Sequence, residues 1–262
     1  MNVSSYSSLY HKSANKTNSI YGKIASGKKI QSAADDAAGL AIGRKMKKQS
    51  TGLDVGAYNI SSGIGVANIK DGALGTMQDS LQRIYELSVQ ASNGIYGSSE
   101  KQMIQDEVDQ LLQDIQRSAV GTEYNNMKLM DGSMADMHIA SNPDGTGMKI
   151  QMENVTLKSL GLEGYNVTGD FDLSAIESAM EKISTARSHT GAVTNSMEHA
   201  FNYNTRASLE LTGARSRIED LDIPKAVSEQ KKDKLLSDYR MGMLQKKMKN
   251  DNVIVKQLFG GM

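Results

Sequence analysis

The sequence predicts a mainly α protein in which long antiparallel coiled-coil helices carry a small β-hairpin region at the tip. The first observation behind this prediction is a run of apolar residues at steps of three and four, the spacing of one helix face. The run consists of Ile60, Ile64, Ala67, Leu74, Met77, Leu81, Ile84, Leu87 and Ala91. A helix from Ile60 to Asn93 is roughly 50 Å long. A single apolar stripe on so long a helix requires partner helices along most of its length.

The second observation is the amino-acid composition. The 262 residues include 16 Met but only three Phe, two Pro and no Trp, and aromatic residues make up 5% of the chain. This composition favours long helices with small and flexible contacts over a compact core. The chain has no Cys, which excludes disulfides and thiolate chemistry.

Charge is unevenly distributed along the chain, although the formal net charge is zero. Residues 1–50 carry nine Lys and Arg against two Asp (+7), residues 225–262 carry nine against four acids (+5), and residues 51–224 therefore have −12. Basic ends suit nucleic-acid or membrane binding, but solvated basic helix faces explain them better, because no basic run is uninterrupted or interleaved with aromatic residues. We predict no nucleic-acid partner and no membrane insertion, since no window approaches the roughly 20 apolar residues that span a bilayer.

The N-terminal half reads as three helical segments. Residues 1–31 form a weak amphipathic helix that needs a packing partner, and Met1 to Tyr10 contain no apolar region of a signal peptide. A second helix begins near Ala37 and continues into the long apolar run, which Asn93-Gly94 ends. Ser99 and Gln102 are a candidate capping box for a helix that returns antiparallel. The stripe of that helix is Ile104, Val108, Leu111, Ile115 and Ala119.

The C-terminal half begins with turns and strands. Asn125-Asn126 is a turn signal, and alternating segments around Met137 and Ile150 predict a β-hairpin. A long helix follows from Leu173 to about Leu221, capped by Ser174 with Glu177. Its stripe is Ile176, Met180, Ile183, Ala186, Val193, Met197, Phe201, Leu209 and Ile218. Pro224 should end or kink this helix, and a final amphipathic helix extends from Val227 towards Phe259.

Five segments resemble those of bacterial flagellins and occur in the family's order. They are SGKKIQSAADDAAGLAIGRKM (26–46), LQRIYELSVQASNG (81–94), IQDEVDQLLQDIQR (104–117), LGLEGYNV (160–167) and GARSRIED (213–220). Hook–filament junction proteins share the architecture, but AADDAAGLAI is nearer to the flagellin form. The resemblance therefore covers nearly the whole chain.

The resemblance implies a flagellar filament subunit that retains only the conserved core. Residues 1–36 and 223–262 correspond to an inner coiled-coil domain. Residues 37–120, 121–171 and 172–222 correspond to the outer-core helices, the hairpin and turn region, and the returning helix. Secretion to the flagellum without a cleaved signal peptide, an export chaperone on the C-terminal segment, and cap or junction proteins as partners are implied in the same way.

The resemblance also implies recognition by the host Toll-like receptor five. Arg83, Leu87 and Glu107 fall on the main contact positions of the family, and Gln82, Glu86 and Gln90 flank them. An Arg beside an exposed Leu and a carboxylate from the next helix would form a contact centre with a polar rim. The alternative is that Arg83 and Glu107 form a surface ion pair and Leu87 belongs to the core.

The remaining candidate residues point to assembly rather than to catalysis. Asp35 and Asp36 resemble a carboxylate pair for metal or acid–base work, but a loop cap or a subunit contact is the better interpretation, because no His lies nearby. We predict no enzymatic activity, no catalytic residue, no metal and no cofactor. The predicted assembly residues are Ile20, Ile24, Asp35, Asp36, Leu235, Tyr239 and Leu244.

Two functions remain open at this point. The first is a self-assembling filament subunit for motility. The alternative is a minor or non-polymerising flagellin-like secreted protein that acts as a hook–filament junction component or an immune ligand. Pro224, the LFGGM terminus and the Ser- and Lys-rich first 31 residues depart from the family pattern and keep the alternative open.

Overall fold

The computed structural model describes residues 15–16 and 18–259 and divides the chain into two compact units. Unit 1 comprises residues 1–48 and 210–262, and unit 2 comprises residues 49–209. Two long helices, α2 (Ala37–Ala91) and α5 (Ser174–Glu219), contribute to both units. The predicted segment Met1 to Tyr10 lies outside the described residues.

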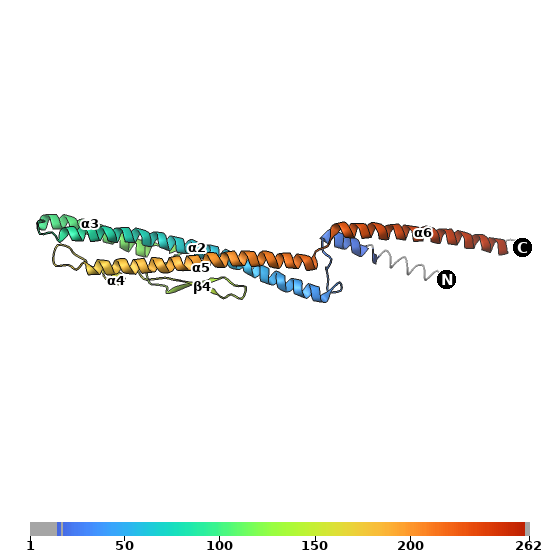
Figure 1. Ribbon diagram of the computed structural model, residues 1–262, viewed down its shortest axis with the longest axis horizontal. Coiled ribbons are helices and arrows are strands. Elements are labelled where there is room, and N and C mark those ends of the chain that lie inside the picture. The colour runs from blue at the N-terminus through green and yellow to red at the C-terminus, as the bar shows by residue number, and fades with distance from the viewer. Residues whose placement is uncertain (1–14, 17, 260–262) are drawn as a thin grey trace. The chain divides into compact units, whose positions relative to one another are not determined.

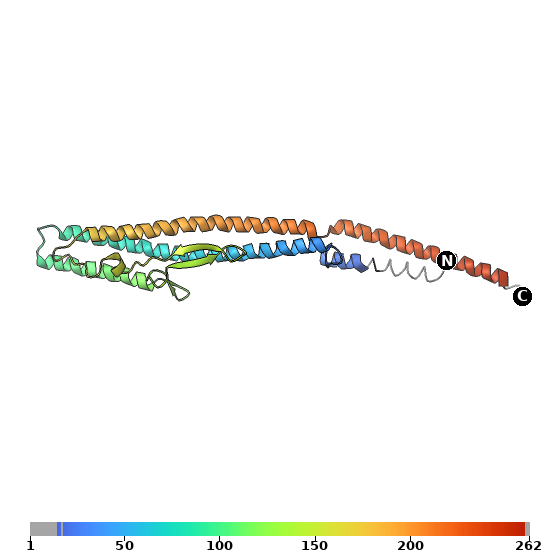
Figure 2. The same cartoon turned by 90° about the horizontal axis from the view of Figure 1, so that it is seen from below.

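Unit 2 is built on α2 and α5, which run antiparallel (Figures 1 and 2). Ser208 Oγ donates to the Ser50 carbonyl at 3.4 Å, and Arg187 Nε donates to Asp71 Oδ1 at 3.1 Å. Later residues of α2 therefore meet earlier residues of α5. The helix α3 (Ser98–Gly121) returns beside the second half of α2 (Figure 2). The prediction of a mainly α fold with long antiparallel helices is confirmed.

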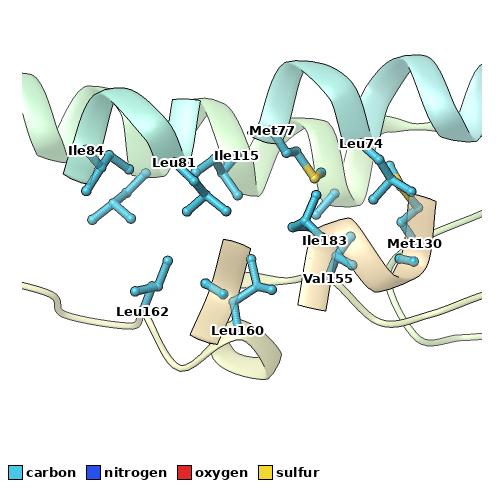
Figure 3. Packing of buried hydrophobic residues seen from close by; sticks show 14 of the residues in the cluster. Leu74, Met77, Leu81, Ile84, Ile115, Met130, Val155, Leu160, Leu162 and Ile183 are labelled. Atoms are coloured by element: carbon cyan, nitrogen blue, oxygen red, sulfur yellow. The ribbon is translucent and has the colours of Figure 1, made fainter. Parts of the chain in front are cut away.

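The predicted α2 stripe forms the centre of the unit 2 core. All of its residues are buried except Ile64, which is half-buried. Figure 3 shows the α2 side chains meeting Ile115 of α3, Ile183 of α5, and Val155, Leu160 and Leu162 of the segment between β4 and α5. Burying a Leu or Ile side chain contributes about 1.5–3 kcal/mol, so this stripe is a main source of stability.

The stripe of α3 differs from the prediction at one position. Leu112 is 6% exposed and belongs to the core, whereas Leu111 is half-buried. The step from Val108 to Leu112 and then to Ile115 keeps the helical spacing, so both leucines fitted the sequence pattern. The inward direction depends on where the partner helices lie, which the spacing alone does not give.

The predicted caps of α3 and α5 are wrong. Gly97 is the N-cap of α3 and has no side chain that could accept a hydrogen bond. Ser99 already lies inside the helix and is not its cap. Ser174 is the first residue of α5, and its N–H donates to Asp172 Oδ1 at 2.9 Å. The acidic side chain two residues earlier therefore binds the first turn in place of Ser174.

Two β-hairpins and one short helix follow α3. The strands β1 (Glu123–Tyr124) and β2 (Met127–Lys128) are joined by Asn125 and Asn126, both with positive φ, as a tight type I′ turn requires. The strands β3 (Asp136–Ala140) and β4 (Gly147–Gln151) pair antiparallel, with Ile150 buried. The predicted hairpin is confirmed. The short helix α4 (Leu157–Leu160) follows it.

The β3–β4 hairpin lies beside α2, where glycines permit a close approach. A Cβ added at Gly56 would lie 2.2 Å from the Ser141 carbonyl oxygen, and one at Gly52 would lie 2.6 Å from Pro143 Cβ. Such distances are too short for any side chain without a shift of the hairpin. The expectation that the hairpin lies at the tip is wrong, because it packs against residues 52–63 of α2 and not at the α2–α3 turn.

Two asparagines fix the end of β3 in this position. Asn59 Nδ2 on α2 donates to the Ala140 carbonyl at 3.0 Å, and Asn204 Nδ2 on α5 donates to the Ser141 carbonyl at 2.7 Å. These bonds satisfy carbonyl groups at the point where the hairpin leaves its ladder. The hairpin is therefore held by both long helices.

The predicted stripe of α5 is buried or half-buried as far as Met197, whereas Phe201 and Leu209 further along it are exposed. Ile176, Ile183 and Ala186 are buried, but Phe201 is 37% and Leu209 72% exposed. The buried positions in the second half include the polar Asn204 and Ser208, which bond to backbone carbonyls. Hydrogen bonding rather than apolar packing therefore decides which side of α5 faces inward here.

Unit 1 joins the two ends of the chain. A helical segment over residues 18–26 leads into a loop whose backbone pairs with the residues after α5. Lys29 N donates to the Glu219 carbonyl at 2.8 Å, and Leu221 N donates to the Gly27 carbonyl at 2.8 Å. Lys16 Nζ lies 2.8 Å from Asp233 Oδ2 on α6 (Ile223–Phe259).

Pro224 lies in the first turn of α6. A proline is well tolerated there, because the amide it lacks would have no intrahelical partner. The preceding helix α5 ends at Glu219. The long helix thus ends close to the predicted Leu221, but the prediction that Pro224 ends or kinks it is wrong, because Pro224 lies in the first turn of the next helix.

Candidate interaction surfaces

Three of the predicted receptor-binding residues meet on the surface of α2 and α3. Arg83 donates from Nε and Nη2 to Glu107 Oε1 at 2.9 and 2.7 Å, and its Nη1 lies 3.5 Å from Glu86 Oε2. About half of each side chain is exposed. The hydrogen bond to Glu107, followed by its charge, raises the pKa of Arg83. The result is a solvated cluster of one guanidinium and two carboxylates.

Leu87 does not belong to this exposed cluster. It is 2% exposed and packs in the unit 2 core. The idea of an exposed Leu beside Arg83 is therefore wrong, because residue 87 lies on the apolar stripe that faces the partner helices. Gln82 and Gln90 are exposed on α2, and Gln90 Nε2 donates to Tyr96 Oη at 3.1 Å.

Asp35 organises the loop before α2. Its Oδ2 accepts the backbone N–H groups of Gln31 and Ser32, each at 3.1 Å, and its Oδ1 lies 2.7 Å from Lys23 Nζ. The hydrogen bond from Lys23 and those from the two amides hold the pKa of Asp35 well below its usual range.

Asp36 caps the helix that follows. Its Oδ1 accepts the Gly39 N–H at 2.9 Å, and its carbonyl accepts the Leu40 N–H at 3.0 Å. This is the position at which Asp satisfies the unpaired amides of a helix N-terminus. Both aspartates thus have the local roles that the loop-cap interpretation describes, and their predicted part in subunit contacts stays a prediction.

The predicted assembly residues of unit 1 differ in exposure. Leu235 and Tyr239 on α6 are 71% and 67% exposed, and Leu244 is half-buried. Ile20 and Ile24 are half-buried in the N-terminal helical segment. Within the described residues, α6 therefore presents large apolar side chains to solvent.

The sequence interpretation missed a buried lysine in the core. Lys70 is 1% exposed, and its Nζ donates to the Gln151 carbonyl at 2.6 Å and to the Glu153 carboxylate. The second carboxylate oxygen of Glu153 is buried without a hydrogen bond, 3.5 Å from His189 Nδ1. A signal existed, because Lys70 occupies the helical position between Ala67 and Leu74 where the apolar stripe skips a turn.

Neither a metal site nor a membrane span is found in the described part of the chain. Among those residues no three His, Asp or Glu gather in a metal-binding arrangement. The helices there also lack the combination of length and hydrophobicity that crossing a bilayer requires.

The chain matches two sequence families that together cover most of its length. Residues 1–135 match the bacterial flagellin N-terminal helical region, and residues 173–255 match the bacterial flagellin C-terminal helical region. The chain belongs to the bacterial flagellin family, and this family consists of structural proteins rather than enzymes.

Individual relatives agree with this assignment. A flagellin of Halalkalibacterium halodurans is 33% identical over 85% of this chain and 84% of its own length. Flagellin FlaB1 of Treponema pallidum is 31% identical over 85% of each chain.

Solved structures support the fold. Bacillus cereus flagellin has a TM-score of 0.50 at 24% identity, covering 56% of this chain and 88% of its own. A Vibrio parahaemolyticus protein assigned to the flagellar hook-associated class has a TM-score of 0.60 at 14% identity, covering 71% of this chain and all of its own. At these identities the likeness concerns the fold alone.

Proposed function

We propose that this chain is a structural subunit that assembles with copies of itself into the flagellar filament for motility. The observation that carries the proposal is the exposed apolar stripe of α6. Leu235, Tyr239 and Met243 follow one another at steps of four, and they are 71%, 67% and 53% exposed. Residues at this spacing share one helix face. An exposed stripe of large apolar residues marks a surface that a partner covers.

The stripe is best tested by the critical concentration for polymerisation, measured by sedimentation. Tyr239→Ser should raise the critical concentration at least about tenfold, since burying an aromatic side chain contributes more than 1.4 kcal/mol. Asp238→Ser is the matched control, because Asp238 is exposed and adjacent but lies off the stripe. Equal critical concentrations for the two variants would contradict a role of the stripe in assembly.

The assembled protein would lie outside the cell. We propose export through the flagellar apparatus without a cleaved signal peptide, with a chaperone on the C-terminal segment and with cap or junction proteins at the filament ends. Family membership supports this route. Export should stop in cells that lack the flagellar export apparatus, and its persistence there would contradict the proposal.

We propose recognition by the host Toll-like receptor five as a second function. The exposed cluster of Arg83, Glu86 and Glu107 supports it, and Gln82 and Gln90 extend the polar surface along α2. The guanidinium and carboxylates would contact the receptor, whereas the buried Leu87 would support the helix from within.

Receptor binding is tested with purified monomer and the receptor ectodomain. Arg83→Ala should weaken binding about tenfold or more, as truncating an interface arginine commonly does. Arg117→Ala is the control. Like Arg83, Arg117 is an exposed arginine that pairs with a neighbouring acid; it lies on α3 and pairs with Asp114 at 2.8 Å. Equal affinity of the two variants would contradict this surface as the binding site.

The alternative function is a minor or non-polymerising flagellin-like protein that serves as a junction component or an immune ligand. It differs from the main proposal in one measurable property. Such a protein would bind its partner without forming filaments at any concentration.

A further inference from the structure

The two structural units carry opposite charges of equal size. Unit 1 contains 20 Lys and Arg against 10 Asp and Glu, a formal charge of +10. Unit 2 contains 10 Lys and Arg against 20 Asp and Glu, a formal charge of −10. Two copies that meet through unlike units therefore attract, and two copies that meet through like units repel.

Unit 1 contains a groove whose charged lining residues are mainly basic. The groove has a volume of about 680 Å³ and lies between the N-terminal helical segment, the first turns of α2 and the end of α5. Its small and apolar lining residues include Gly22, Ala25 and Leu40, and its charged ones include Lys28, Arg44 and Glu219. We call it the basic groove.

The charged residues of the basic groove differ in their pairing. Lys28 Nζ lies 3.2 Å from Glu219 Oε2, so the charge of this half-exposed lysine is paired with a buried carboxylate of the wall. Arg44 is exposed and makes no ion pair with any residue that the structure describes. A guanidinium offers five N–H donors in a planar fork that matches a carboxylate. Arg44 is thus a cation available to an acidic partner.

The helix α3 of unit 2 has the complementary chemistry. It carries Glu100, Asp106, Glu107, Asp109 and Asp114 against two basic residues. Asp106 is exposed, and in the described part of the chain its contact is a hydrogen bond from Gln102 Nε2 at 3.2 Å rather than an ion pair. Met103 lies three residues earlier on the same face and is 63% exposed. This face offers a carboxylate for Arg44 and an apolar side chain for the small residues of the groove.

We propose that the basic groove of one copy receives the acidic α3 face of unit 2 of a second copy, with Arg44 contacting Asp106. The inference rests on the proposed self-assembly and specifies one of its contacts. Because the groove and the α3 face are different surfaces, the contact is head-to-tail and repeats from copy to copy.

The test compares the critical concentrations of full-length variants at low ionic strength. Arg44→Glu should raise the critical concentration at least about tenfold, because close charge pairs at interfaces have coupling energies above 1.4 kcal/mol. Lys45→Glu makes the same charge change on the neighbouring, exposed residue outside the groove. It should change the critical concentration by less than about threefold, since a rim charge acts mainly at long range. Circular dichroism of each variant serves as the check that its helices are folded.

A charge exchange then tests the occupant. The double variant Arg44→Glu with Asp106→Arg restores opposite charges at every repeat of the contact and should return the critical concentration to within about threefold of the wild type. Equal effects of Arg44→Glu and Lys45→Glu would overturn the groove as a specific site. A selective effect of Arg44→Glu without rescue would overturn α3 as its occupant. Failure of the wild-type protein to polymerise would instead contradict the proposed function itself.

Discussion

The ammonium group of Lys70 is buried against the carboxylate of Glu153, which joins the middle of α2 to the segment after β4. Lys70→Met should lower the free energy of unfolding of unit 2 by about 3 kcal/mol, because removing one partner leaves a poorly compensated carboxylate. Urea unfolding followed by circular dichroism measures this loss.

An exposed lysine provides the comparison for that measurement. Lys182 Nζ donates to the Ser159 carbonyl at 2.7 Å at the surface of unit 2. Lys182→Met should change the free energy of unfolding by no more than about 0.5 kcal/mol. The buried pair would have no special role if both substitutions had the same effect.

Gly56 sets how closely the hairpin approaches α2. Gly56→Ala should destabilise unit 2 by about 1–3 kcal/mol, because its Cβ would meet the Ser141 carbonyl oxygen. Gly65→Ala, in the same helix, has no neighbour within 4 Å of its Cβ. It should stabilise the helix by up to about 1 kcal/mol. Opposite signs in thermal or urea unfolding are expected, and equal signs would contradict the close approach of the hairpin.

Asp36 should control the local stability of the first turn of α2. Asp36→Ala removes the acceptor of the Gly39 N–H and should cost about 1 kcal/mol, as the loss of an N-cap does. Amide hydrogen exchange at Gly39 should then be about fivefold faster. Asp36→Asn retains an acceptor and should exchange at nearly the wild-type rate. Unchanged exchange in the Ala variant would contradict the capping role.

Asp35 should make the loop before α2 sensitive to acid. The folded-state pKa of Asp35 is lowered by Lys23 and by the amides of Gln31 and Ser32. The stabilisation is therefore fully present above the unfolded pKa of about 3.9 and is lost as the pH falls through the lower folded pKa. The amide NMR shifts of Gln31 and Ser32 should titrate below about pH 3.9, and Asp35→Asn should abolish this transition. Titration at a higher pH would contradict the predicted contacts.

The helical spacing of apolar residues predicted much of the fold, because helices place residues three and four apart on one face. It identified the buried α2 stripe. The alternation of apolar and polar residues, which is the spacing of a strand, identified the β3–β4 hairpin in the same way. Spacing does not say which of two adjacent helical positions faces inward. This explains why Leu112 is buried instead of the predicted Leu111.

Long-range polar contacts lay beyond the sequence patterns. Asn204 is buried because Ser141, 63 residues earlier, brings a carbonyl to it. The order of elements along the chain suggested that the hairpin lies at the tip. That order could not reveal its docking on Gly56, which depends on contacts between segments far apart in sequence. Arg83 and Glu107 were brought together as predicted, but Leu87 faces the core since it follows the apolar spacing of α2.

Seeded polymerisation decides whether this chain is a filament subunit. Purified monomer is added to short filament seeds, and growth is followed by light scattering, negative-stain microscopy and circular dichroism. We expect the seeds to lengthen and the scattering to rise with the added monomer. A concurrent gain in helical signal would show that helices form on assembly. Seeds that do not grow, in the presence of monomer whose helices are folded, would contradict the claim.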